Sequence, residues 1–412
     1  MSSKLKSPTG LQPKLRFPEF RDKEGWQKQP LEKFLDYHQP TPYLVADTKY
    51  SNSYETPVLT AGKTFLLGYT NEQHGIFKEG LPVIIFDDFT TATQFVDFPF
   101  KAKSSAMKIL QAKNGASIKF MYETLQMIPY AVATHERHWI SKFAPMQTPM
   151  PVNPKEQLKI ADCLSSVDEL ITAQGQKVEA LKAHKKGLMQ QLFPAEGETL
   201  PQLRFPEFRH APEWEAKPLS KICIVLQGYG FPEILQGRRE GKYPFCKVSD
   251  ISRSVAERGG VLAEAANYIG DDELSKLRAK LIPIGATVFA KIGEALRLNR
   301  RAYVQKECLI DNNVVGLKAI HGVADDRFIY LLSQQIDLNE HCGGAVPSVN
   351  KSTLEEIEVA IPDALNEQKR IADCLSSVDE LITAETQKLE VLKTHKKGLM
   401  QQLFPSPEES MP

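Results

Sequence analysis

Basic residues gather in two segments of the sequence, although the chain as a whole carries no net charge. Lys and Arg together number 51, as do Asp and Glu. Residues 276–301 nevertheless hold seven cations against one acid, and residues 101–119 hold five lysines and no acid. Such clusters can neutralise phosphates, while neighbouring Asn, Gln and Ser side chains reach base edges. The two segments predict contacts with nucleic acid, with an ordinary solvated charged face as the alternative for each.

Other motifs that could do chemistry fail on their spacing. Gly62-Lys63-Thr64 ends like a phosphate-binding loop, but Pro57 stands where that loop needs glycine. Residues 362–369 have the residue types of a PD/ExK nuclease at a spacing too short for two strands. No tetrapeptide of a base methyltransferase is present, and the six cysteines form no CxxC pair. We therefore expect reduced thiols, no metal, no cofactor and no catalytic site.

The sequence also has no segment suited to a membrane. No stretch approaches the roughly 18 apolar residues of a spanning helix, and MSSKLKSPTG has no apolar core behind its positive charge. A secretory signal requires such a core. We therefore expect a cytoplasmic protein without a membrane partner.

An internal repeat organises the chain. Residues 160–194 and 371–405 differ at only five of 35 positions, and LRFPEFR occurs early in each half. The middles, 35–150 and 222–362, share almost no identity. Drift after a duplication would spread the differences evenly, so the pattern indicates constrained ends and freely diverging middles.

The near-identical segments predict two long helices with a coiled-coil seam, because apolar residues recur at alternating spacings of four and three. The seam and docking residues are Leu164, Ile171, Leu181, Leu188, Leu192, Leu375, Ile382, Leu392, Leu399 and Leu403. A helix of about 38 residues is roughly 57 Å long, and its apolar stripe must be buried. We expect the helices to pair antiparallel, with parallel pairing as the alternative. Gly187 and Gly398 predict close packing, against a partner subunit or within the pair.

The diverging middles predict α+β domains. In the second half, residues 243–251, 286–293 and 314–320 are typical of strands, and 325–336 of a helix. Residues 81–89, 106–110 and 117–128 follow the same plan in the first half. The predicted architecture has a pseudo-two-fold internal repeat of two globular domains joined by the helices. Its parts are domain 1–152, helix 153–194, domain 195–365, helix 366–405 and tail 406–412.

The motifs closely resemble those of type I restriction-modification specificity subunits, over the whole chain. They are LRFPEF, EQ-x-x-IA, KKGLMQQLFP, PFCKVSDI, FAKIGEA, IDNNVVGL and PSVNKSTLEEIEVAIP. The resemblance implies a non-catalytic subunit that assembles with two adenine methyltransferase subunits and ATP-dependent restriction (translocase) subunits. Each target-recognition domain would read half of a bipartite double-stranded DNA target. The helices would separate the domain centres by on the order of 16 base pairs.

The basic segments and the resemblance together give the candidate DNA-binding residues. They are Lys63, Lys101, Lys103, Lys108, Lys247, Lys291, Arg297, Arg300, Arg301, Asn313, Asn350 and Lys351. The resemblance puts Lys247, Lys291, Asn313 and Asn350 on the groove side. Two alternatives stay open: a coiled-coil scaffold that binds proteins without reading DNA, and an enzyme of the same system with a fused catalytic domain.

Overall fold

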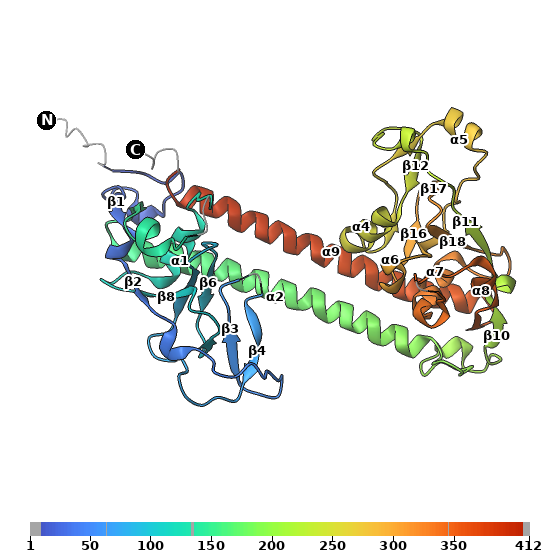
Figure 1. The fold of residues 1–412 in the computed structure, drawn as a ribbon, viewed down its shortest axis with the longest axis horizontal. Coiled ribbons are helices and arrows are strands. Elements are labelled where there is room, and N and C mark those ends of the chain that lie inside the picture. Colours follow the sequence, from blue (N-terminus) through green and yellow to red (C-terminus); the bar gives the residue numbers. More distant parts are fainter. Residues whose placement is uncertain (1–9, 63, 133–135, 345, 407–412) are drawn as a thin grey trace. The chain divides into compact units, whose positions relative to one another are not determined.

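The computed structural model describes residues 10–62, 64–132, 136–344 and 346–406 and divides into two compact units. Unit 1 combines the chain up to Gln174 with the segment from Leu389 onward, and unit 2 is Gly175–Lys388. Each unit therefore contains part of both long helices (Figure 1). No helix among the described residues is both long enough and apolar enough to cross a bilayer.

Unit 1 is built on an antiparallel sheet in the order β2-β8-β5-β6, beside a smaller sheet β4-β3-β7 and a β1-β9 pair. Its central strand VIIFD is buried along its whole length, which explains the continuous apolar run. The element bounds are β1 Gln27–Pro30, β2 Leu35–His38, β3 Thr56–Leu59, β4 Leu66–Thr70, β5 Val83–Asp87, β6 Thr93–Val96, β7 Lys101–Ala102, β8 Met107–Ala112, β9 Gln147–Met150 and α1 Ile118–Gln126.

Unit 2 repeats this plan with more elements. Its main sheet has the order β11-β18-β15-β16-β13, and a lobe of β14-β12-β17 with α5 extends from it (Figure 1). The strands are β10 Glu215–Pro218, β11 Cys223–Gln227, β12 Tyr243–Cys246, β13 Val261–Leu262, β14 Tyr268–Ile269, β15 Thr287–Ala290, β16 Ala302–Val304, β17 Leu309–Ile310, β18 Val314–Ala319 and β19 Glu358–Ile361. The helices are α3 Leu219–Ile222, α4 Val248–Arg258, α5 Asp271–Leu277, α6 Glu294–Arg297, α7 Asp326–Gln335 and α8 Lys351–Glu356.

One predicted strand in unit 2 is wrong in its second half. The strand expected over 243–251 ends at Cys246, and α4 begins at Val248. The strand ends there because a helix begins. The Asp250 carboxylate accepts a hydrogen bond of 2.8 Å from the Lys247 backbone N–H and so caps α4. The apolar residues of this segment therefore belong to two different elements.

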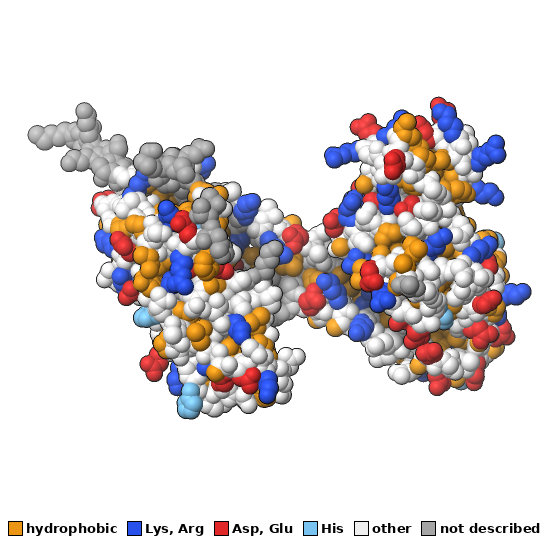
Figure 2. All heavy atoms as spheres, viewed as in Figure 1, with side chains coloured by type: hydrophobic (Ala, Val, Ile, Leu, Met, Phe, Trp, Pro, Cys, Tyr) orange, Lys and Arg blue, Asp and Glu red, His pale blue; other side chains and the backbone are white. Residues whose placement is uncertain are grey.

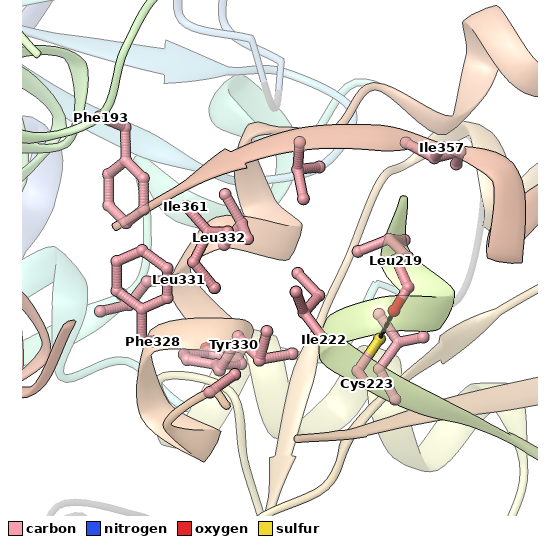
Figure 3. Packing of buried hydrophobic residues seen from close by; sticks show 14 of the residues in the cluster. Phe193, Leu219, Ile222, Cys223, Phe328, Tyr330, Leu331, Leu332, Ile357 and Ile361 are labelled. Atoms are coloured by element: carbon pink, nitrogen blue, oxygen red, sulfur yellow. Dashed lines mark hydrogen bonds between the residues drawn. The ribbon is translucent and has the colours of Figure 1, made fainter. Parts of the chain in front are cut away.

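The ends of the long helices enter the cores of the units. Helix α2 spans Pro154–Leu192 and α9 spans Leu365–Leu403. Phe193, which follows α2, packs against Phe328 of α7 with ring centroids 5.3 Å apart (Figure 3). Phe404, which follows α9, stacks on Phe120 of α1 at 5.4 Å in unit 1. The phenylalanine of the repeated LFP motif thus packs against a phenylalanine of the core in each unit.

A buried carboxylate at the start of each long helix anchors the LRFPEF motif. In unit 1 the Arg16 guanidinium donates two hydrogen bonds of 2.7 Å to Glu156, and Trp26 adds one of 3.1 Å. The side chain of Glu156 is 1% exposed. We call this arrangement of Arg, Glu and Trp the clasp of unit 1.

Unit 2 has the same arrangement, the clasp of unit 2. Arg204 donates to Glu367 at 2.7 and 2.8 Å, and Trp214 donates at 3.2 Å. The next residue, Gln368, accepts a hydrogen bond of 2.9 Å from the backbone N–H of Asp325, the residue that caps α7. Glu367 therefore binds the arginine of the LRFPEF motif, and Gln368 binds the start of α7. Glu367 is not free for nuclease chemistry.

Within each unit the two long helices are joined by ion pairs. In unit 2, Lys185 of α2 lies 2.7 Å from Asp379 of α9, and Lys177 lies 2.9 Å from Glu385. The residue nearer the end of α2 thus meets the residue nearer the start of α9, so the segments run antiparallel there. In unit 1, Lys396 of α9 lies 2.8 Å from Asp168 of α2.

The apolar faces of these helices are largely covered. The ten seam residues predicted from the sequence are buried or half-buried: Leu164, Ile171, Leu181, Leu188, Leu192, Leu375, Ile382, Leu392, Leu399 and Leu403. Leu170 and its repeat equivalent Leu381 lie off this seam and are 57% and 52% exposed. A side chain added at Gly187 or Gly398 would meet nothing within 4 Å. Close packing of these glycines within the described chain is therefore not observed.

Candidate nucleic-acid interface

Lys291 lies at the centre of a cluster in unit 2 that gathers several segments distant in sequence. It directly follows strand β15, and its backbone N–H donates to the carbonyl of Asn313 at 2.9 Å. Its own carbonyl accepts from the Val349 N–H at 2.9 Å. Both sides of the Lys291 backbone are thus held by the segments that carry Asn313 and Asn350. The side chain extends to Gln227, at the end of β11, with Nζ 2.9 Å from Oε1.

Lys247 is the second lysine of this region. Lys247 follows β12, and its Nζ donates to Gln236 Oε1 at 2.8 Å while lying 5.1 Å from the Phe231 ring centroid. Asp311 links the segments of Lys247 and Asn313, since its backbone N–H donates to the Cys246 carbonyl at 3.0 Å and its Oδ1 accepts from the Asn313 N–H at 2.9 Å. Burial raises the pKa of Asp311, and the Asn313 N–H and the charges of the two lysines oppose that shift. We call Gln227, Gln236, Lys247, Lys291 and Asn313 the strand-end cluster.

Four further candidates of unit 2 have exposed or partly exposed side chains. Asn350 caps α8, because its Oδ1 accepts from the Thr353 N–H at 2.9 Å. The side chain of Lys351 is 52% exposed and lies 3.4 Å from Glu355. Arg297 is exposed and lies 3.6 Å from Glu294, whereas Arg300 is half-buried. Three of these four side chains thus present exposed or partly exposed positive charge.

Arg301 and Lys101 do not fit the sequence-based expectation of exposed, phosphate-binding cations. Arg301 is 4% exposed, donates to the Ile336 carbonyl at 3.1 Å and packs 4.5 Å from the Phe289 ring. Its burial lowers the pKa to about 10. Lys101 is 2% exposed, and its Nζ lies 2.6 Å from the His74 carbonyl oxygen. Both cations hold loops of their own unit in place because they hydrogen-bond to backbone carbonyl groups.

Lys108 is the third buried cation, and its polar partners explain why this charge can be buried. It is 1% exposed, and its Nζ lies 3.5 Å from Asp88 and 3.2 Å from Gln39. Asp88 in turn accepts a hydrogen bond of 2.8 Å from the Trp139 backbone N–H. Lys103 is half-buried with its Nζ 6.0 Å from the Tyr50 ring. Lys63 lies outside the described residues.

The equivalent strand end in unit 1 has the opposite charge. Asp88 follows β5 as Lys291 follows β15, and its N–H donates to the Ala106 carbonyl at 2.9 Å in the way that Lys291 donates to Asn313. The charge of Asp88 is neutralised by the buried Lys108. The two units thus share a backbone plan and differ in the chemistry at this position.

Lys and Arg side chains are interspersed with Asp and Glu over the visible face of each unit (Figure 2). The basic segments of the sequence therefore do not form a single broad positive surface on the face shown in Figure 2.

Comparison with known proteins gives the family. The chain is 31% identical over 383 residues to the specificity subunit of the type I restriction enzyme EcoR124I/EcoR124II of Escherichia coli. That match covers 87% of this chain and 88% of the relative. The chain belongs to the type I restriction enzyme specificity subunits.

Further matches agree with this membership. Residues 212–394 of this specificity subunit match the family model described as type I restriction modification DNA specificity domain. A putative type I restriction enzyme MjaX specificity subunit of Methanocaldococcus jannaschii is 28% identical over 270 residues, covering 62% of this chain and 58% of the relative. The crystal structure of an S subunit from M. genitalium has a TM-score of 0.62 at 15% identity and covers 96% of this chain and 100% of that one. The fold is shared with that S subunit.

Two residues of the strand-end cluster were missed in the sequence. Gln227 and Gln236 belong to no motif and lie outside the basic segment, so only their contacts with lysines reveal them. No sequence signal marked them, because neither glutamine lies in a predicted strand or a recognised motif.

Proposed function

We propose that each unit of this specificity subunit reads one half of a bipartite double-stranded DNA target. The observation that supports this best is the strand-end cluster, where segments far apart in sequence bring together lysine and amide side chains beside the ends of β11, β12 and β15. Lys247, Lys291 and Asn313 extend from turns rather than from strand interiors, so they can reach a groove without distorting the sheet. The preorganised Lys291 backbone favours recognition over a merely solvated surface.

The long helices form an antiparallel coiled coil with pseudo-two-fold symmetry. The supporting contacts are the Lys185–Asp379 and Lys396–Asp168 pairs, which join the same two repeat positions once in each unit. In this arrangement residues 1–152 and 195–365 form the two recognition domains. Residues 153–194 and 366–405 form the spacer helices, which set the unspecified gap of the target.

The helices also carry the docking sites for two methyltransferase subunits. An exposed leucine at the same repeat position of each helix, Leu170 and Leu381, offers an apolar anchor to a partner that binds twice. The open space around Gly187 and Gly398 leaves the helix surface accessible there. Catalysis belongs to these partners and to the restriction subunits, and this chain performs no catalytic step itself. A cytoplasmic location follows from its DNA target.

Methylation mapping tests this function. Cells that express the full chain with its modification subunits should carry a bipartite methylated motif, which a scaffold without DNA reading would not produce. Charge reversal of Lys291 and Arg300 to Glu should then weaken duplex binding by the assembled methylase about 10-fold or more, because both changes add repulsion from phosphates. The magnitude of the slope of log K against log salt should fall by about 1 for each of these side chains that neutralises a phosphate.

Lys221→Glu is the matched control for this double variant. Lys221 is exposed in α3, at the opposite end of β11 from the cluster, and its reversal should leave binding unchanged. Assembly, measured by size-exclusion chromatography, should be intact in all variants. Equal binding by the double variant and the wild type would remove the strand-end cluster from the DNA interface.

A further inference from the structure

The two lysines of the strand-end cluster each pair with a glutamine, and this pairing fixes what the cluster presents to a ligand. An ammonium group only donates hydrogen bonds, so Gln227 must turn Oε1 toward Lys291 and Gln236 must turn Oε1 toward Lys247. The amide nitrogens then face away from the lysines. Each pair therefore offers mainly hydrogen-bond donors, from the remaining ammonium hydrogens and the amide NH2 group, against the one lone pair that Oε1 keeps.

A surface on which donors outnumber acceptors discriminates among bases in the major groove. Guanine presents two adjacent acceptors there, N7 and O6, whereas adenine presents one acceptor beside the N6 donor. Cytosine presents a donor, and thymine presents one acceptor beside a methyl group. Two neighbouring donors are thus matched by guanine and opposed by the donor of adenine or cytosine.

We propose that unit 2 reads guanine in the major groove through the Lys291–Gln227 pair, with Lys247–Gln236 as a second pair of the same design. This inference rests on the proposed function, since it assumes that the unit binds duplex DNA. Lys291 makes the base contact, and Gln227 is a positioning residue that holds the ammonium and adds its own N–H donors. The backbone hydrogen bonds to Asn313 and Val349 place Lys291 before DNA arrives.

The corresponding position of unit 1 supports the assignment by contrast. There the strand end carries Asp88, and the donors of Lys108 are already used by the Asp88 carboxylate and by Gln39. Both charged side chains are 1% exposed. Unit 1 therefore has no donor pair available at this place, and guanine reading by such a pair is specific to unit 2.

Methylome sequencing of cells that carry the full chain and its modification subunits provides the test, with wild type, Lys291→Met, Lys291→Arg, Gln227→Met and Lys221→Met compared. We expect a motif in which one half contains guanine. Lys291→Met should lower the discrimination at that single guanine about 10-fold to 100-fold, in line with the worth of a good base contact. Lys291→Arg should retain guanine, because its guanidinium also donates two hydrogen bonds.

Gln227→Met should relax the same position to a smaller extent, whereas Lys221→Met should leave the motif unchanged. A purely structural role for Gln227 would reduce methylation at every site without changing the base preference. Uniform loss in Lys291→Met would assign Lys291 to phosphate and overturn the inference while leaving the proposed function intact. A wild-type chain that yields no bipartite motif would overturn both.

Discussion

Removal of Arg204 should destabilise unit 2 far more than a typical surface change. In the clasp of unit 2, Arg204 donates two hydrogen bonds to Glu367, whose side chain is 1% exposed. Arg204→Met removes both bonds and leaves a buried carboxylate with Trp214 as its donor. The cost of such an uncompensated buried charge is about 3–5 kcal/mol.

The measured shift follows from this free energy. For a unit of this size the urea dependence of unfolding is about 2–3 kcal/mol per M, so the midpoint should fall by about 1–2.5 M. Hydrogen exchange read by mass spectrometry across a urea series separates the units, since peptides of β11 and α7 report on unit 2. Peptides of β5 and α1 report on unit 1 and act as an internal control.

A neighbouring ion pair supplies the matched variant. Arg370 lies 3.2 Å from Glu207, with side chains 51% and 49% exposed, so Arg370→Met should cost less than about 1 kcal/mol. The double variant Arg204→Met with Glu367→Met should recover much of the lost stability, because it buries no unpaired charge. Equal midpoints for Arg204→Met and Arg370→Met would refute the clasp as a major source of stability.

Two further predictions concern buried groups. Lys108→Met should lower the stability of unit 1 by about 3–5 kcal/mol, because Asp88 is left unpaired. A urea midpoint equal to that of the wild type would instead support the sequence-based prediction that Lys108 is a surface cation. Burial raises the pKa of Cys223 to about 12 from an ordinary value near 9, so ionisation above pH 9 favours the unfolded chain. The wild type should therefore lose up to about 1.4 kcal/mol per pH unit between pH 9 and 12 relative to Cys223→Ser, and parallel pH profiles would contradict this.

The long helices and the main strands could be predicted because one physical signal dominates each of them. A heptad pattern that continues through 35 repeated residues leaves few alternatives to a helix, and α2 and α9 extend over it. The run VIIFD is buried on both faces as β5. The 243–251 segment failed because its apolar residues continue across a helix start that depends on one side chain, Asp250.

Counts of basic residues predicted the site less reliably than the apolar patterns predicted the helices and strands. Lys101, Lys108 and Arg301 count equally with Lys291 in a sum of basic residues, yet each is buried and binds a carbonyl or carboxylate group that lies far away in sequence. A sequence window cannot register such partners. The contribution of Gln227 was hidden for the same reason, since it depends on a contact across 64 positions.

The clasp explains why the ends of each half are constrained while the middles diverge. Arg16 and Arg204 bind carboxylates that belong to the long helices, and Phe404 and Phe193 of the helix ends pack beside Trp26 and Trp214. These contacts fix the frame of each sheet without involving the strand ends. Asp88 and Lys291 therefore occupy the same backbone position with opposite charge. A frame fastened in this way tolerates a change of recognition chemistry as long as each buried charge keeps a partner, as Asp88 does in Lys108.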